Sequence, residues 1–206
     1  HLNHTDITLM KLIKLLLIAT AFISSSVFAQ QQEAPDRLLE SVANSLFADI
    51  GKVNSQGNAS KAAMSKIVET RLMPHIDVKF VSFKLLGKHI KGIEREQAVR
   101  FIDAVEHYLT GTYAGALMKY TGQQVVFEHN NAKSDSEYAT VNTQIIEPNA
   151  PTIDLSFKLR LGKNNEWKVY DIVAEGISLL SAKQKEIIQR ISEVGLEQVI
   201  SELKSK

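Results

Sequence analysis

The chain has 206 residues, of which 44% are hydrophobic, 23% charged and 7% aromatic, a globular composition that excludes a disordered or fibrous protein. It contains no cysteine, which excludes disulfides, thiolate metal sites, cysteine nucleophiles and acylation on an N-terminal cysteine. The 24 basic and 23 acidic residues give a formal net charge of +1, which predicts no strong attraction to nucleic acid or to an anionic membrane.

The N-terminal segment has the pattern of a secretory signal peptide. Lys11 and Lys14 follow Met10, residues 15–23 form an apolar stretch, and small residues lead to a cleavage site after Ala29. The apolar stretch is too short for a transmembrane helix, which needs about 20 residues. We therefore expect this segment to direct export and to be cleaved after Ala29.

The sequence accordingly divides into three parts. Residues 1–9 precede the first methionine and are interpreted as upstream residues, residues 10–29 as the signal peptide, and residues 30–206 as a single domain. We expect no membrane span in this domain and no lipid anchor on it, because acylation needs a cysteine. These features predict an exported, freely diffusing protein, which in a Gram-negative cell would be located in the periplasm.

The first half of this domain has the periodicity of amphipathic helices. Asp36 is placed to cap a first helix, Asn58 or Ser60 to cap a second, and Pro74 to end it. Residues 94–120 form the longest predicted helix, with apolar side chains at helical spacing. This half of the domain is therefore predicted to be mainly helical.

After the long helix the apolar period changes to two, which is typical of half-buried strands. A first strand contains Val125 and Phe127, and further strands cover residues 137–146, 153–161 and 167–175. The strand at 153–161 has the clearest alternation, with aliphatic residues on one face and polar residues on the other. We expect these four strands to form an antiparallel sheet.

A closing helix follows the sheet. Ser181 and Gln184 fit a capping box at its start, and Gly195 interrupts the apolar stripe before it resumes. The predicted order is four or five helices, four antiparallel strands, and one or two closing helices. This order indicates an α+β fold.

The residues give little sign of catalysis. The sequence has no nucleophile elbow, no Ser-x-x-Lys motif and no phosphate-binding glycine loop. The histidines lack metal-ligand spacing, and Asp103 with His107 is typical of a solvated helical contact. Asp171 lies among apolar residues and, if buried, must be hydrogen-bonded or protonated. It is either a general base in an apolar cup or a carboxylate that accepts from backbone amides where its strand turns into the last helix.

Broad apolar faces are the positive signal. The helical stretches 80–86 and 101–117 are apolar over wide arcs, and the strand at 153–161 has one apolar, mainly aliphatic face. Helices of this kind wrapped around a curved sheet either fill the core completely or leave an apolar cavity between sheet and helices.

Three segments of the chain stand out together, namely RLMPHIDVKFVSFKLLGKHI at 71–90, YLTGTYAGALMKYTGQ at 108–123 and WKVYDIVAEGISLLSAKQ at 167–184. In this order and spacing they resemble the MlaC family of periplasmic phospholipid-binding proteins, whose members are also described as toluene-tolerance or ABC-transporter auxiliary proteins. The third is the most specific, and the likeness extends over essentially the whole domain.

The resemblance implies a fold and a function. The fold is α+β, a curved four-stranded antiparallel sheet wrapped by helices, of the nuclear-transport-factor or cystatin-like kind, with an apolar pocket between sheet and helices. The function is that of a carrier, not an enzyme, with no cofactor and with a glycerophospholipid as cargo. Its partners would be the outer-membrane complex of MlaA with a porin and the MlaD subunit of the inner-membrane transporter, and we expect a monomer.

The matching segments also suggest which residues line the pocket. We take the side chains on their apolar faces, while Trp167 and Tyr170 either line the pocket or seal the core. The predicted lipid-binding residues are Phe80, Phe83, Leu86, Phe101, Val105, Tyr108, Tyr113, Leu117, Val141, Ile153, Leu155, Phe157, Val169, Ile172 and Val173.

Two other functions are compatible with the residues. One is an exported enzyme that uses Asp171 as a general base. The other is a module that docks to a transporter and carries nothing, which would require a solidly filled core.

Overall fold

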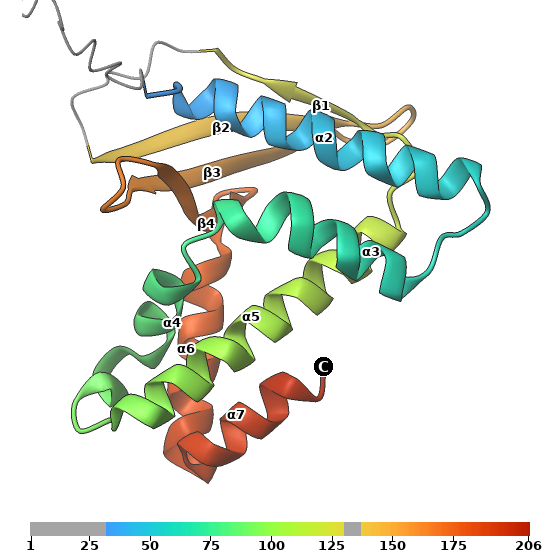
Figure 1. The fold of residues 1–206 in the computed structure, drawn as a ribbon. Coiled ribbons are helices and arrows are strands. Elements are labelled where there is room, and N and C mark those ends of the chain that lie inside the picture. The colour runs from blue at the N-terminus through green and yellow to red at the C-terminus, as the bar shows by residue number, and fades with distance from the viewer. Residues whose placement is uncertain (1–31, 130–136) are drawn as a thin grey trace, which may run out of the picture. The chain divides into compact units, whose positions relative to one another are not determined.

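The computed structural model describes residues 32–129 and 137–206, in which helices pack against one open antiparallel sheet (Figure 1). The expected upstream residues 1–9 and the expected signal peptide 10–29 lie outside the described residues. From Glu33 to Lys206 the chain forms one compact unit. The predicted α+β class is confirmed.

The first helix, α2 (Pro35–Ser55), begins at a proline, whose fixed φ suits the first turn of a helix. Its N-cap is Ala34, and Asp36 lies inside the first turn. The prediction that Asp36 caps this helix is therefore wrong, because the helix starts at Pro35, two residues earlier than a cap at Asp36 would give. An acidic residue in the first turn still interacts favourably with the helix dipole.

Helix α3 (Lys61–Ile67) begins as predicted. The Ser60 hydroxyl accepts a hydrogen bond from the Ala63 backbone amide at 3.0 Å, the usual N-cap contact. The helical path continues through a π-helical turn, η1 (Val68–Leu72), and a 3₁₀ turn, η2 (Met73–His75), which contains Pro74. The helical path ends in the turn that contains Pro74, as predicted.

Two more helices complete the first half. Helix α4 (Val78–Leu86) is capped by the Asp77 carboxylate and ends at Gly87, where the chain continues into a 3₁₀ turn, η3 (Gly87–Ile90). Gly87 has φ +51°, and a Cβ placed there would lie 2.6 Å from Ile188 Cδ1. Helix α5 (Arg95–Met118) starts with a capping box of Glu94 and Gln97.

The sheet is an antiparallel meander in the order β1-β2-β3-β4-β5. Its strands are β1 (Gln124–Phe127), β2 (Tyr138–Ile146), β3 (Ile153–Leu161), β4 (Trp167–Ala174) and β5 (Ile177–Ser178). The prediction of four strands is corrected to five. The additional strand pairs only Val173 with Ser178 and Ala174 with Ile177, and two residues are too few to show a period in the sequence.

The helices that follow are α6 (Leu179–Val194) and α7 (Leu196–Lys204), separated by Gly195 as predicted. Helix α6 begins earlier than expected, because its N-cap is Ser178 and not Ser181. The Ser178 hydroxyl accepts from the Ser181 backbone amide at 3.0 Å. The capping-box pattern at Ser181 and Gln184 therefore lies one turn inside the helix, and that prediction is wrong.

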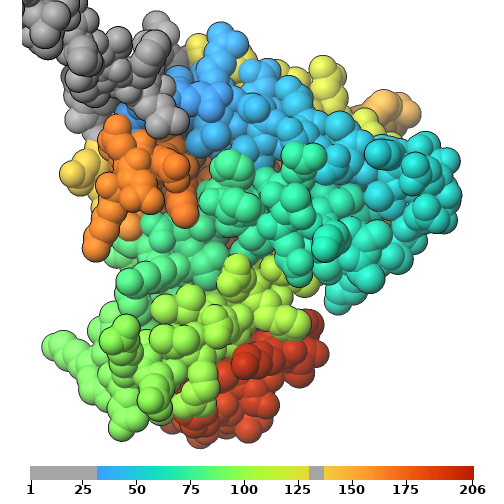
Figure 2. All heavy atoms as spheres, viewed as in Figure 1, coloured from blue at the N-terminus to red at the C-terminus, as the bar shows by residue number. Residues whose placement is uncertain are grey.

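Three groups of buried apolar side chains form the core. The first joins α4, α5, α6 and α7 around Phe101. The second joins α2, α3 and α5 around Ile50, and the third packs α2 against the sheet around Leu159. Strand β4 contributes Val169 to the third group and Tyr170 to the contacts of the first. It therefore runs between the sheet core and the helical core. In Figure 2, α2 and α3 lie at the top of the visible face, and α5 and α7 lie below them.

Candidate functional site

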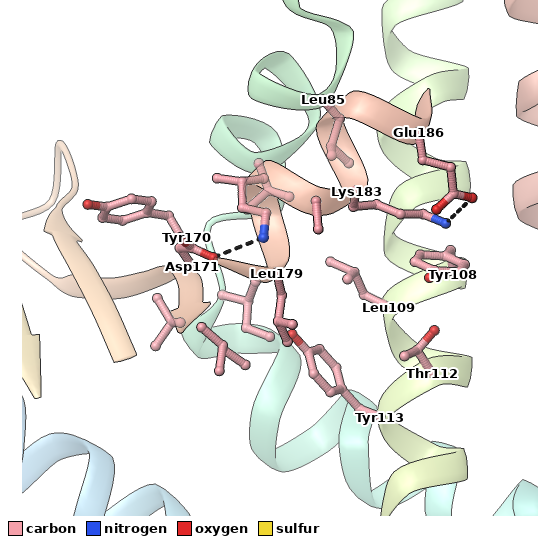
Figure 3. Close-up of a pocket in the computed structure, with 16 residues that line it drawn as sticks. Leu85, Tyr108, Leu109, Thr112, Tyr113, Tyr170, Asp171, Leu179, Lys183 and Glu186 are labelled. Carbon is pink, nitrogen blue, oxygen red and sulfur yellow. Dashed lines mark hydrogen bonds and ion pairs between the residues drawn. The ribbon is translucent and has the colours of Figure 1, made fainter. Parts of the chain in front are cut away.

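A cavity lies where β4 meets helices α4, α5 and α6 (Figure 3). Its volume is about 320 Å³, at the lower end of the roughly 300–1,000 Å³ that ligand pockets occupy. Most of its wall is aliphatic or aromatic. The lining residues are Ile76, Val81, Leu85, Tyr108, Leu109, Thr112, Tyr113, Val169, Tyr170, Asp171, Ile172, Leu179, Leu180, Ala182, Lys183 and Glu186.

Helix α5 supplies one wall through its helical spacing. Tyr108, Leu109, Thr112 and Tyr113 line the cavity, and residues four apart on a helix project from the same face. Residues on another part of this helix, including the fully buried Phe101, pack into the helical core. One helix therefore serves both the core and the cavity.

The first two turns of α6 supply the opposite wall. Leu179, Leu180, Ala182, Lys183 and Glu186 all face the cavity, while Ile187 and Ile191 further along are buried against the other helices. The cavity thus lies at the N-terminal end of α6, where the helix leaves the sheet.

An irregularity in β4 supplies the third wall. Val169 pairs with Leu159, but Asp171 pairs with Lys158, so that Tyr170 is one additional residue on β4. Such a bulge bends the strand and increases its twist. Four consecutive residues, from Val169 to Ile172, consequently line the cavity, whereas a regular strand would present only alternate ones.

Asp171 is a capping residue of α6. Its Oδ2 accepts a hydrogen bond from the Ser178 hydroxyl at 2.6 Å, and its Oδ1 accepts one from the Leu180 backbone amide at 3.0 Å. Asp171 is 8% exposed, and both carboxylate oxygens are engaged. Of the two interpretations left open by the sequence, the structure favours the carboxylate that accepts hydrogen bonds where β4 turns into the last helix.

One edge of the cavity is charged. Lys183 extends from α6 towards α5, with its Nζ 2.9 Å from Glu186 Oε1 and 4.5 Å from the centre of the Tyr108 ring (Figure 3). The ammonium group therefore makes both an ion pair and a cation–π contact. This edge contrasts with the apolar walls formed by α4 and β4.

Tyr113 is a neutral phenol inside the cavity. Burial raises the pKa of its hydroxyl to about 12, and the nearby Asp171 and Tyr108 add to this shift. A phenol with such a pKa stays protonated at any physiological pH. It therefore adds a weakly polar group to the wall and no charge.

The structure places four of the predicted lipid-binding residues on the cavity wall, namely Tyr108, Tyr113, Val169 and Ile172. Tyr170, for which the sequence left lining the pocket and sealing the core both open, lines the cavity as well. Trp167 is buried in the sheet core.

The other predicted residues lie elsewhere. Those in the helical core or packed against it are Phe83, Leu86, Phe101 and Val105, while Leu117 packs on the second core group. Val141 and Phe157 belong to the sheet core, and Phe80 packs edge-on against Tyr170. Ile153 is exposed, and Leu155 and Val173 are half-buried on the sheet and are not among the residues that line the cavity.

Several wall residues escaped the sequence analysis. Val81 and Leu85 of α4 belong to the helical core and also line the cavity, so periodicity could not separate the two surfaces. The α6 residues Leu180 and Lys183 lie inside the third segment that resembles the MlaC family, which was the available signal. The apolar pattern of this helix predicts only that it closes the core, and does not show that its first turns line a cavity.

Other kinds of site find no support in residues 32–129 and 137–206. No group of three His, Asp or Glu side chains there is arranged to hold a metal ion. None of the helices in these two ranges has the length and apolar character needed to cross a membrane. A second hollow of about 240 Å³ lies between α2 and β1, with Glu40 and Gln123 among its lining residues.

Comparisons with known proteins agree on one group. The family model described as MlaC protein matches residues 40–205. The intermembrane phospholipid transport system binding protein MlaC of Haemophilus influenzae is 29% identical over 192 residues, which are 92% of this chain and 89% of that protein.

A solved structure has the same fold. It is that of a phospholipid-binding protein from Ralstonia solanacearum in complex with a phospholipid, and it matches with a TM-score of 0.74 and 22% identity. The match covers 84% of this chain and 98% of that one. At this identity the likeness establishes the shared fold.

Proposed function

Because this chain belongs to the MlaC family, we propose that it binds a glycerophospholipid and carries it between two membranes. The acyl chains enter the cavity between β4, α4, α5 and α6. The observation that carries this proposal is the cavity itself, whose walls are mostly aliphatic and aromatic. The related proteins from Haemophilus influenzae and Ralstonia solanacearum, named for phospholipid transport and phospholipid binding, support it.

The physical need for a carrier follows from the hydrophobic effect. Each methylene group transferred out of water contributes about 0.8 kcal/mol. A single long acyl chain therefore costs on the order of 10 kcal/mol to expose, and a free two-chain lipid does not cross an aqueous space at a useful rate. An apolar cavity removes this barrier, provided that its affinity stays near that of the bilayer so that the lipid can leave again.

The size of the cavity suggests how it is filled. Its 320 Å³ suits only part of a lipid with two long chains, so we infer that the walls separate as the chains enter. Leu179 on the wall is 48% exposed, and Ile177 just before it is 62% exposed. Bound chains would cover this apolar surface at the junction of β5 and α6.

The proposed route follows from the family. The protein acts in the periplasm after cleavage of its signal peptide. It receives phospholipid from the outer-membrane complex of MlaA with a porin and delivers it to MlaD of the inner-membrane transporter, which keeps the outer leaflet free of phospholipid. The absence of a spanning helix from the described ranges is compatible with this route.

The proposal is tested by lipid acquisition from vesicles of phosphatidylglycerol, followed by separation of protein from vesicles and measurement of bound lipid. The wild-type chain should acquire lipid. Ile172→Glu places a carboxylate on the apolar wall, where an unpaired charge costs several kcal/mol. Bound lipid should therefore fall by roughly tenfold or more.

Val173→Glu is the matched control, because this next residue on β4 is not among the residues that line the cavity. It should leave lipid acquisition close to the wild-type level, with folding of both variants checked by circular dichroism. A wild-type chain that acquires no lipid, or two folded variants with equal loading, would contradict the proposal.

A further inference from the structure

We propose that Lys183 binds the phosphate group of the lipid at the rim of the cavity, with Glu186 as its partner when no phosphate is bound. This inference rests on the proposed function and adds a polar recognition site to it. The ligand chemistry is a phosphate diester with one negative charge, held next to acyl chains that occupy the apolar cavity.

Lys183 lies at the boundary between the apolar wall and solvent. Its side chain is 18% exposed, whereas that of Glu186 is 59% exposed. Lys183 is therefore the more buried member of the pair, and both side chains line the cavity. Figure 3 shows Lys183 and Glu186 next to each other at the edge of the cavity.

The position is an unusual one for a lysine. Burial acts to lower the pKa of Lys183, but its interactions with Glu186 and Tyr108 raise it by more, so the pKa lies above its ordinary value. The side chain is thus charged at neutral pH. Holding a charge beside an apolar wall is unfavourable unless it is paired, and an alkyl residue would line the cavity without this penalty.

Lys183 is also the charged wall residue suited to receive an anion. Both Asp171 oxygens accept hydrogen bonds from Ser178 and Leu180, and Glu186 pairs with Lys183 itself. An ammonium group has three donors, and Glu186 Oε1 accepts one of them at 2.9 Å. Donors remain for phosphate oxygens, and lysine is a common phosphate ligand in proteins.

Tyr108 positions the cation. The lysine nitrogen lies 4.5 Å from the centre of the Tyr108 ring, a contact that favours a cation over the ring face. Tyr108 comes from α5 and Lys183 from α6. The charge is therefore held between the two helices that form opposite walls, where the polar part of a lipid would emerge.

The test compares two lipids that share their acyl chains. Fluorescent phosphatidylglycerol and the corresponding diacylglycerol, which lacks the phosphate, are titrated with wild-type protein, Lys183→Gln and Lys183→Arg. Lys183→Gln should weaken phosphatidylglycerol binding about tenfold, the value of one charge-assisted hydrogen bond, and should leave diacylglycerol binding unchanged. Lys183→Arg keeps the charge and should restore much of the loss.

Two further variants sharpen the result. Lys185→Gln, at an exposed lysine of the same helix with no hydrogen bond or ion pair in the described part of the chain, should change neither lipid. Glu186→Gln removes the internal partner of Lys183 and should strengthen phosphatidylglycerol binding. If the ion pair only stabilised α6, Glu186→Gln would weaken binding of both lipids or change neither.

Failure of this inference is distinct from failure of the proposed function. Equal loss of both lipids in Lys183→Gln, or no loss of either, would overturn the phosphate site while leaving the carrier intact. If the wild-type chain binds neither lipid, the proposed function itself fails. Inorganic phosphate should not compete, because it lacks acyl chains. Competition by it at concentrations similar to the lipid would assign the site to a free anion and overturn the lipid proposal.

Discussion

Asp171 and Ser178 fix the start of α6 beside the cavity. The Asp171 carboxylate accepts from the Ser178 hydroxyl and the Leu180 amide, and the Ser178 hydroxyl accepts from the Ser181 amide. These contacts satisfy backbone amides that the first turn of a helix leaves without partners. The two residues therefore hold the α6 wall in position.

This network predicts a specific pattern of stability losses. Asp171→Ala and Ser178→Ala should each lower the free energy of unfolding by about 1–3 kcal/mol, because each leaves buried or capping groups without a partner. The double variant should lose less than the sum of the two, since both belong to one network. Denaturant unfolding monitored by circular dichroism measures these values.

Ser181→Ala is the control for this prediction, because the Ser181 hydroxyl is not the helix cap. It should change the free energy of unfolding by no more than about 0.5 kcal/mol. If Ser181→Ala were as damaging as Ser178→Ala, the start of α6 would be at the capping box that the sequence suggested.

At the scale of elements, α2 is tied to the sheet by a charged contact. His129, just after β1, has its Nδ1 2.9 Å from Asp36 Oδ2 and its Nε2 3.3 Å from Glu40 Oε2. Asp36 and Glu40 lie one turn apart on α2. The histidine therefore joins the first turns of the helix to the strand that follows α5 in the chain.

This contact predicts an acid-sensitive contribution to stability. Burial acts to raise the pKa of Asp36, but hydrogen bonds from His129 and from backbone amides lower it by more. Because the folded-state pKa lies below the unfolded value of about 3.9, the stabilisation is present above that value. It is lost as the pH falls through the folded-state pKa.

The measurement is the free energy of unfolding as a function of pH for wild type, Asp36→Asn and Asp103→Asn. Asp36→Asn should be less stable than wild type near neutral pH, with a difference that shrinks on acidification below about pH 4. Asp103, exposed on α5 without a hydrogen bond or ion pair among the described residues, should follow the wild-type curve. A pH-independent deficit in Asp36→Asn would show that its carboxylate charge does not contribute.

The elements also show what the sequence could and could not predict. The strand at 153–161 and the helix at 94–120 were readable because each has a long, regular apolar pattern, and both are confirmed within a few residues. Strand β5 and the start of α6 could not be predicted from the sequence, because a two-residue strand has no period. Strand β5 depends on the chain reversal at Glu175 and Gly176, both of which have positive φ.

At the scale of the whole molecule, the resemblance to the MlaC family is confirmed by the match over residues 40–205. The α+β order was also readable from the change of apolar period at the end of α5. The cavity was harder to place, because Phe101 and Val105 of the core and Tyr108 and Tyr113 of the wall lie on one helix. An apolar side chain in a sequence does not reveal whether it faces protein or an open space.

The bulge at Tyr170 also made the cavity-lining residues hard to predict from the sequence. It turns consecutive β4 residues onto one wall, and strict alternation along the strand could not predict this. The residues that define the site therefore depend on contacts between β3 and β4 that are remote in sequence.

Photocrosslinking tests the central claim most directly, because it reports where in the molecule the acyl chains lie. The protein is loaded from vesicles with a phospholipid that carries a diazirine near the end of one acyl chain, irradiated, and digested for mass spectrometry. The account predicts labelled peptides from residues 108–113 of α5 and 169–172 of β4. Labels confined to the exposed surface of α2 or β1, with none at these two segments, would contradict it.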